Sequence, residues 1–192
     1  GVGFSALGAN TTGGTNTAIG HEALDANTTG ANNVAMGYNS LGANTTGSSN
    51  VGIGLNALLA NTTADSVTAV GANAMAANTT GIDNVAFGAS ALATNTTGKF
   101  MTAIGVEALQ THNTTNGGGV LSTAVGYKAL KLEPTRGSNT AVGGGTLDNL
   151  TTGEATTGVG VNALGAQTTA SNNTAVGYNA GDVITTSPSN TC

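Results

Sequence analysis

The stretch Thr17–Asn33, TAIGHEALDANTTGANN, decides the fold because most of the chain repeats it. Three further copies follow without a gap from Val34, Val51 and Thr68: VAMGYNSLGANTTGSSN, VGIGLNALLANTTADSV and TAVGANAMAANTTGIDN. Each copy is 17 residues long. A fixed short period is typical of repeat architectures, in which each unit is stabilised by its neighbours.

With Thr17 as position 1, position 4 is a glycine that recurs along the whole chain. The interval is 17 residues except between Gly105 and Gly126, where it is 21 because of an insertion within residues 111–122. We therefore interpret residues 1–192 as a single array of eleven 17-residue coils. Because the first and last repeats are incomplete, we expect the chain to be a slice of a longer fibre.

Composition excludes several classes of protein. Charged residues make up 7% and the net charge is −5 with four Lys and Arg residues, so a nucleic-acid partner is not expected. No apolar run is long enough for a membrane span. The one cysteine, Cys192, cannot form a disulfide within the chain. The strictly periodic apolar positions argue against disorder.

The first three positions of the repeat predict a short strand. Position 1 is Thr or Val, position 2 is mostly Ala or Gly, and position 3 is apolar, while Leu or Met is usual at position 8. We predict that positions 1, 3 and 8 point inward, since β-branched side chains favour a buried strand face. The recurrent glycine leaves too few residues for a helix, and Asn-Thr-Thr-Gly indicates a turn. The expected fold is all-β, a parallel β-solenoid.

The small residues at position 2 and the mostly Ala position 7 leave two alternatives open. They form a flat strip that allows a second subunit to approach closely, or they pack tightly inside the coil.

The repeated tetrapeptides also resemble a known family. The tetrapeptides TAIG, VAMG, TAVG and VAFG resemble the head repeats of YadA-like trimeric autotransporter adhesins in the copies preceded by Asn16, Asn33, Asn84, Asn139 and Asn173. The longer unit, TAVGYNAL-like with ANTTG, resembles repeats of phage and phage-like tail fibres. The resemblance covers essentially the whole chain. It implies a left-handed β-roll, a homotrimer, and contact with host cells or matrix, whereas the period of 17 residues is longer than in the adhesin heads.

No catalytic, cofactor-binding or metal site is expected. Three G-x-G-x-x-A stretches mimic a dinucleotide-binding turn, but each is an ordinary repeat with Gly at position 2. His21-Glu22 lacks the second histidine of a zinc-protease helix. We therefore do not expect an enzyme, and we interpret both histidines as solvated.

Two sets of polar residues, which recur at fixed positions of the repeat, allow more than one functional interpretation. The Thr pair at positions 12 and 13 suggests an ice-binding plane or, more simply, turn chemistry with hydroxyl ladders between coils. The Asn at position 11, and Asn113 in the insertion, open Asn-Thr-Thr acceptor sequons. In a eukaryotic secreted protein these would carry glycans: Asn10, Asn27, Asn44, Asn61, Asn78, Asn95 and Asn113.

Residues 111–137 form the one irregular zone, with an insertion and three of the four basic residues. Irregularities in solenoids often map to an exposed binding face. The partner-binding candidates are His112, Lys128, Lys131 and Arg136. A tolerated loop is the simpler alternative.

These observations predict a non-enzymatic structural or adhesive segment of an extracellular, cell-surface or virion fibre. The expected partners are further copies of the chain and a host surface or glycan receptor. An ice-binding solenoid and a self-assembling extracellular filament subunit are the alternatives.

Overall fold

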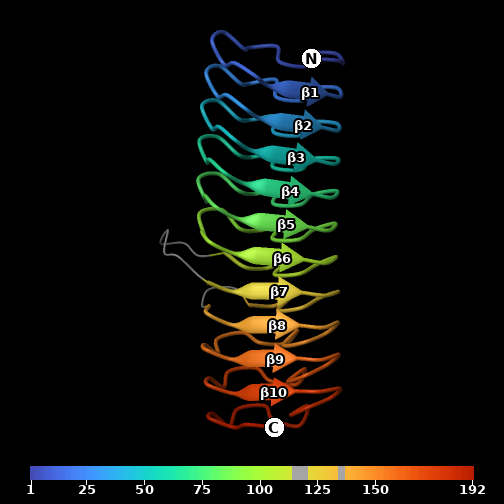
Figure 1. Cartoon of the computed structure of the whole chain (residues 1–192), viewed down its shortest axis with the longest axis vertical. Helices are drawn as coiled ribbons and strands as arrows, with labels where there is room; N and C mark the ends of the chain where they lie inside the picture. Colours follow the sequence, from blue (N-terminus) through green and yellow to red (C-terminus); the bar gives the residue numbers. More distant parts are fainter. Residues whose placement is uncertain (114–120, 134–136) are drawn as a thin grey trace.

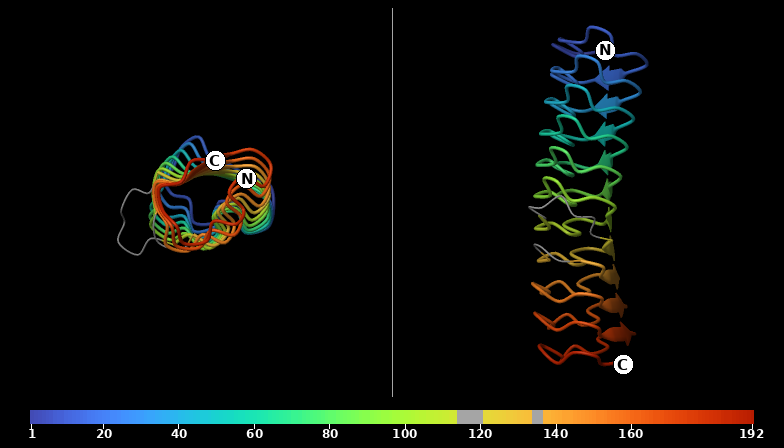
Figure 2. Two further views of the ribbon diagram at one scale, coloured as in Figure 1. Left: turned by 90° about the horizontal axis from the view of Figure 1, so that it is seen from below. Right: turned by 90° about the vertical axis from the view of Figure 1, so that its left-hand side faces the viewer.

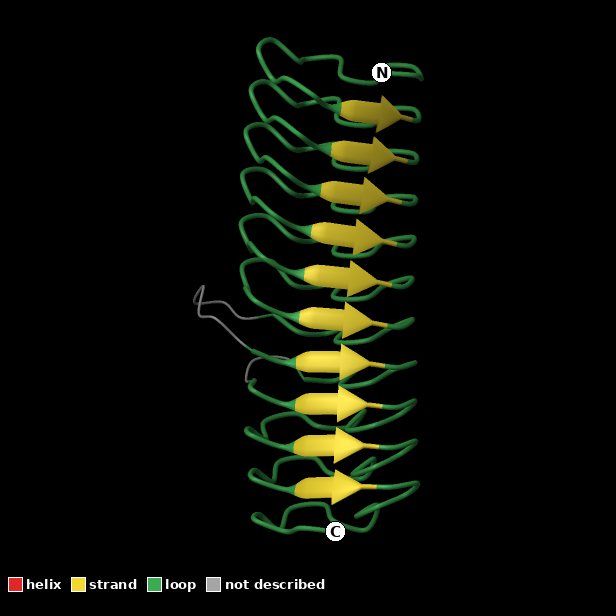
Figure 3. Ribbon diagram, in the orientation of Figure 1, coloured by secondary structure: helices red, strands yellow, loops and turns green. Residues whose placement is uncertain are grey.

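The computed structural model describes residues 1–113, 121–133 and 137–192. Ten three-residue strands stack in chain order into one parallel sheet, and the two ends of the chain lie at opposite ends of a rod (Figure 1). The strands are β1 Thr17–Ile19, β2 Val34–Met36, β3 Val51–Ile53, β4 Thr68–Val70, β5 Val85–Phe87, β6 Thr102–Ile104, β7 Thr123–Val125, β8 Thr140–Val142, β9 Thr157–Val159 and β10 Thr174–Val176. The described residues contain no helix (Figure 3).

The parallel β-solenoid predicted from the period is confirmed. Every neighbouring pair of strands is in register, as in Thr17 opposite Val34 and Ala18 opposite Ala35. Nine turns connect the ten strands, and end-on the successive turns superpose into one closed outline (Figure 2). Of the eleven predicted coils, the first contributes the single bridge Val2 to Ile19 and the other ten carry the strands. Thr191, which begins the next repeat, forms a single bridge with Thr174.

The predicted orientation of the strands is wrong. The middle residue of every strand, Ala or Gly at position 2, is buried, while positions 1 and 3 are exposed or partly exposed. The reason is the narrow interior. A Cβ added to Gly52 at position 2 would lie 3.2 Å from Leu41 Cγ, so a β-branched side chain does not fit there.

The core is therefore built from small residues and one large residue per coil. Ala at positions 2 and 7 packs with Leu or Met at position 8, as in Ala69, Ala74 and Met75, all fully buried. Of the two alternatives for the small-residue strip, tight packing inside the coil is confirmed and the subunit interface is wrong. The inward position 8 predicted from the sequence is also confirmed.

Left-handed backbone at position 8 directs this large side chain inward. Leu58, for example, has a φ of 55° and donates its N–H to Ala74 O of the next coil at 3.0 Å. Bulky residues seldom adopt this conformation. The backbone hydrogen bonds between equivalent turns of neighbouring coils compensate this strain.

Candidate interaction surface

A regular outward strand face runs along the ten strands of the sheet. We define it as positions 1 and 3 of β1–β10, which carry Thr, Val, Ile, Met and Phe and no charged residue in these ten strands. Nine steps of about 4.8 Å make it about 43 Å long. Several of its apolar side chains are well exposed, including Phe87 at 56% and Ile104 at 41%. Large exposed apolar patches are typical of surfaces that contact other molecules.

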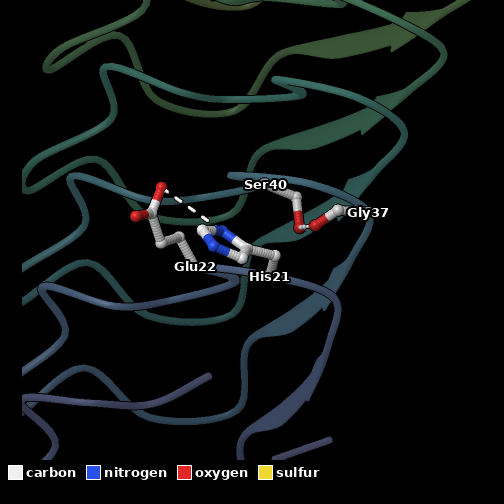
Figure 4. A network of polar contacts seen from close by, with 4 residues as sticks. All are labelled: His21, Glu22, Gly37 and Ser40. Carbon is white, nitrogen blue, oxygen red and sulfur yellow. Dashed lines mark hydrogen bonds and ion pairs between the residues drawn. The ribbon is translucent and has the colours of Figure 1, made fainter. Parts of the chain in front are cut away.

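Position 5 extends this face sideways with further apolar and aromatic side chains. Phe4, His21 and Tyr38 stack in consecutive coils, with neighbouring ring centroids 5.2 Å apart. His21 also lies 3.6 Å from Glu22 Oε2 through its Nδ1, at the turn shown in Figure 4. As predicted, His21 is solvent-exposed.

The two threonine columns differ in what their hydroxyls do. At position 12, Oγ1 donates to the position 12 carbonyl of the next coil, as from Thr28 to Thr45 O at 3.0 Å and from Thr45 to Thr62 O at 3.0 Å. Position 13 points outward, as at Thr63. The ladder alternative is therefore confirmed for position 12. In most of these pairs the position 12 hydroxyl thus bonds to a backbone carbonyl, whereas Thr96 Oγ1 donates to the side chain of Asn113 at 2.7 Å.

The sequon asparagines form a buried hydrogen-bond ladder. Nδ2 of Asn44 donates to Asn27 Oδ1 of the preceding coil at 2.8 Å and to Gly47 O at 3.0 Å. The side chains of Asn27, Asn44, Asn61, Asn78 and Asn95 are fully buried. The folded chain has no room for a glycan on these five residues. Asn10 and Asn113 are partly exposed.

A second ladder runs along position 17, immediately before each strand. Asn33 Oδ1 accepts the backbone N–H of Asn50 at 2.9 Å, and Asn33 Nδ2 donates to Gly47 O at 2.9 Å. Each such amide thus ties two coils together at the point where the strand begins. The sequence motif Asn-Thr/Val-Ala therefore serves inter-coil bonding.

The basic-zone candidates do not form one site. His112 is fully buried, so the prediction that it is solvated is wrong. Lys128 Nζ lies 4.8 Å from the centre of the Tyr127 ring, and Lys131 Nζ pairs with Glu107 Oε2 at 2.8 Å. This pairing holds the pKa of Glu107 below its usual value. Arg136 lies outside the described residues.

Glu133 is the residue of this zone that sequence reasoning missed. Its Oε1 accepts hydrogen bonds from Asn139 Nδ2 at 2.8 Å and Ser122 Oγ at 3.3 Å, all within the core. The signal was its place in the repeat: counted from Thr123, Glu133 occupies position 11, the position of the buried asparagines.

Among the described residues, no group of three or more His, Cys, Asp or Glu side chains is arranged to hold a metal ion. Within those same ranges, no helix has the length and apolar character to cross a bilayer. No protein-family model, curated protein or solved structure matches the chain.

Proposed function

We propose that this chain is a structural segment of an extracellular, cell-surface or virion fibre that associates with further copies of itself through the outward strand face. The observation that carries the proposal is the uncharged outward face that runs along all ten strands and exposes large apolar side chains in several of them. Such a face loses its contact with water when a partner covers it, and this favours association.

A second copy of the chain is the partner that the face fits best. A partner that contacts every rung of a 43 Å face at once must itself repeat at about 4.8 Å, because strand spacing sets the spacing of the side chains. Another copy has that period along its whole length. The family resemblance adds that the assembly has three copies and that the solenoid is left-handed.

The mechanical role rests on how the coils are bonded. Strand pairing joins each of the ten strands to the next, and the position 12 hydroxyls and the two asparagine ladders add bonds between many of the coils. A rod built this way resists bending without any catalytic group. Contact with a host surface or glycan receptor is the adhesive part of the proposal.

The mass of the native assembly, measured by light scattering, tests self-association. We expect a multiple of the chain mass, and a three-fold mass for the trimer. Phe87→Lys or Ile104→Lys should reduce the mass to that of one chain, because an ammonium group on the covered face loses its hydration. Since position 3 lies outside the core, the far-UV circular dichroism should stay unchanged.

Thr63→Lys is the matched control, since it adds the same charge at an exposed turn position. We expect it to leave the assembly mass unchanged. A monodisperse single-chain mass for the unmodified protein would contradict self-association. Thermal hysteresis in that monomer would then support the ice-binding alternative, with the Thr residues of the strand face as its array.

A further inference from the structure

The buried column at position 11 changes its chemistry in the middle of the rod. The column is asparagine from Asn10 to Asn95, and from Asn27 onward each of these asparagines donates Nδ2 to Oδ1 of the preceding one, at 2.7 to 3.2 Å. The next rungs are His112 and Glu133, followed by Leu150. The amide ladder therefore ends at Asn95, whose Oδ1 accepts the backbone N–H of Gly98 at 3.0 Å instead.

His112 and Glu133 occupy the same place on consecutive coils. Thr102 pairs with Thr123 in the sheet, and Leu109 N–H donates to Ala129 O at 3.1 Å, so the register continues around the coil. The two rungs lie ten residues after these paired threonines. Two titratable side chains thus follow one another inside the core.

His112 is fully buried and neither ring nitrogen makes a hydrogen bond within the described residues. Burial lowers its pKa from 6.5 to about 4, and the backbone of Glu133 opposes this shift only in part. The folded coil therefore stabilises the neutral imidazole of His112 relative to the protonated one.

Glu133 is fully buried too, and its Oε2 has no hydrogen-bond partner among the described residues. Burial raises its pKa from 4.5 to about 8, against the opposing hydrogen bonds from Asn139 and Ser122. The nearby charged side chains Glu107, Lys128, Lys131 and Asp148 interact with one another, and none of them shifts the pKa of His112 or Glu133.

Gln167 shows what a neutral side chain does at this position. Its Oε1 accepts from Asn173 Nδ2 at 2.8 Å, as Glu133 Oε1 does from Asn139. Its Nε2 donates to Ala170 O at 2.8 Å. The site thus suits a group that accepts on one side and donates on the other, as a protonated carboxyl does and a carboxylate does not.

We propose that the His112–Glu133 step is a pH-dependent joint of the rod, closed while both side chains are neutral and opening locally when either one ionises. This inference does not depend on the proposed self-association. It places a pH-sensitive opening between the asparagine ladder that ends at Asn95 and the coil of Leu150.

The two pKa shifts determine how the stability of the joint changes with pH. The folded pKa of Glu133 is raised, so its contribution to stability is complete below pH 4.5 and is lost as pH rises to about 8. The folded pKa of His112 is lowered, so its contribution is complete above pH 6.5 and is lost as pH falls to about 4. Between pH 4.5 and 6.5 the stability gained from His112 with rising pH offsets the stability lost from Glu133, so the opening constant of the joint changes little.

Amide hydrogen exchange, corrected for its intrinsic pH dependence, tests the joint on the whole chain. From pH 6.5 to 8 we expect the opening constant at the Leu130 and Glu133 amides to rise about 8-fold. Proton release from Glu133 in the open coil raises the constant about 16-fold, and the loss of the proton that the open coil holds on His112 at pH 6.5 halves it. The Leu41 amide, bonded to Ala57 O at 2.9 Å, should show no such rise. An unchanged opening constant at the joint would overturn the proposal.

Three variants test which side chains cause the pH-dependent opening. Glu133→Gln should abolish the alkaline opening, and Gln167→Glu should create the same pH dependence two coils further on. His112→Asn should remove the weaker loss below pH 4.5, since Asn fits the ladder above it. If Glu133→Gln keeps the wild-type alkaline opening while melting as cooperatively as wild type, the carboxyl is not the sensor and the proposal fails.

Discussion

Gly88→Ala is expected to destabilise the solenoid by about 3–5 kcal/mol, from backbone strain together with a steric clash. Gly88 has a φ of 139°, which side-chain-bearing residues rarely adopt. An added Cβ would lie 2.5 Å from the backbone C and O of Gly105 in the next coil. Neither the strand spacing nor the turn can relax without breaking inter-coil bonds. The midpoint of urea denaturation measures the loss.

Gly14→Ala is the matched control for this substitution. A Cβ on Gly14 meets no atom within 4 Å, and its φ lies outside the left-handed range. We expect a change of about 0.5 kcal/mol or less. Equal losses of stability in the two variants would mean that the close approach of neighbouring backbones at position 4 does not exclude a side chain there.

Asn61→Ala is expected to cost about 2–4 kcal/mol, at about 0.5–1.5 kcal/mol for each of the three hydrogen bonds that it removes. Asn61 Nδ2 donates to Asn44 Oδ1 at 2.9 Å and to Ala64 O at 3.3 Å, and Asn61 Oδ1 accepts from Asn78 Nδ2 at 3.0 Å. Alanine removes all three bonds without bringing water to the site. Denaturant titration and amide exchange in the neighbouring coils measure the effect.

Thr63→Ala, two residues away, provides the comparison for Asn61→Ala. Thr63 is exposed at the turn, so its replacement should change stability by about 0.5 kcal/mol or less. A loss of stability for Asn61→Ala as small as that for Thr63→Ala would contradict the structural role of the asparagine ladder.

The asparagine column illustrates why a motif needs its tertiary setting. Asn-Thr-Thr is an acceptor sequon by sequence, and the same three residues form a turn whose amide and first hydroxyl bond to adjacent coils. Nothing in one repeat distinguishes these uses, because the bonding partners lie 17 residues away. His112 and Glu133 were likewise hidden, since their burial depends on sharing a position with the asparagines.

The period of the sequence determined most of the architecture: parallel strands in register, a turn at each position 4 glycine, and a large inward residue at position 8. Which face of the strand points inward was decided only by the tertiary structure. Alternation in a three-residue strand fits either orientation. Strand propensity alone favours the orientation that buries the two β-branched residues. The closed coil is too narrow for them, as the 3.2 Å approach of a Cβ on Gly52 to Leu41 indicates. Alanine therefore fills the core, and Val, Ile and Thr form the outer face.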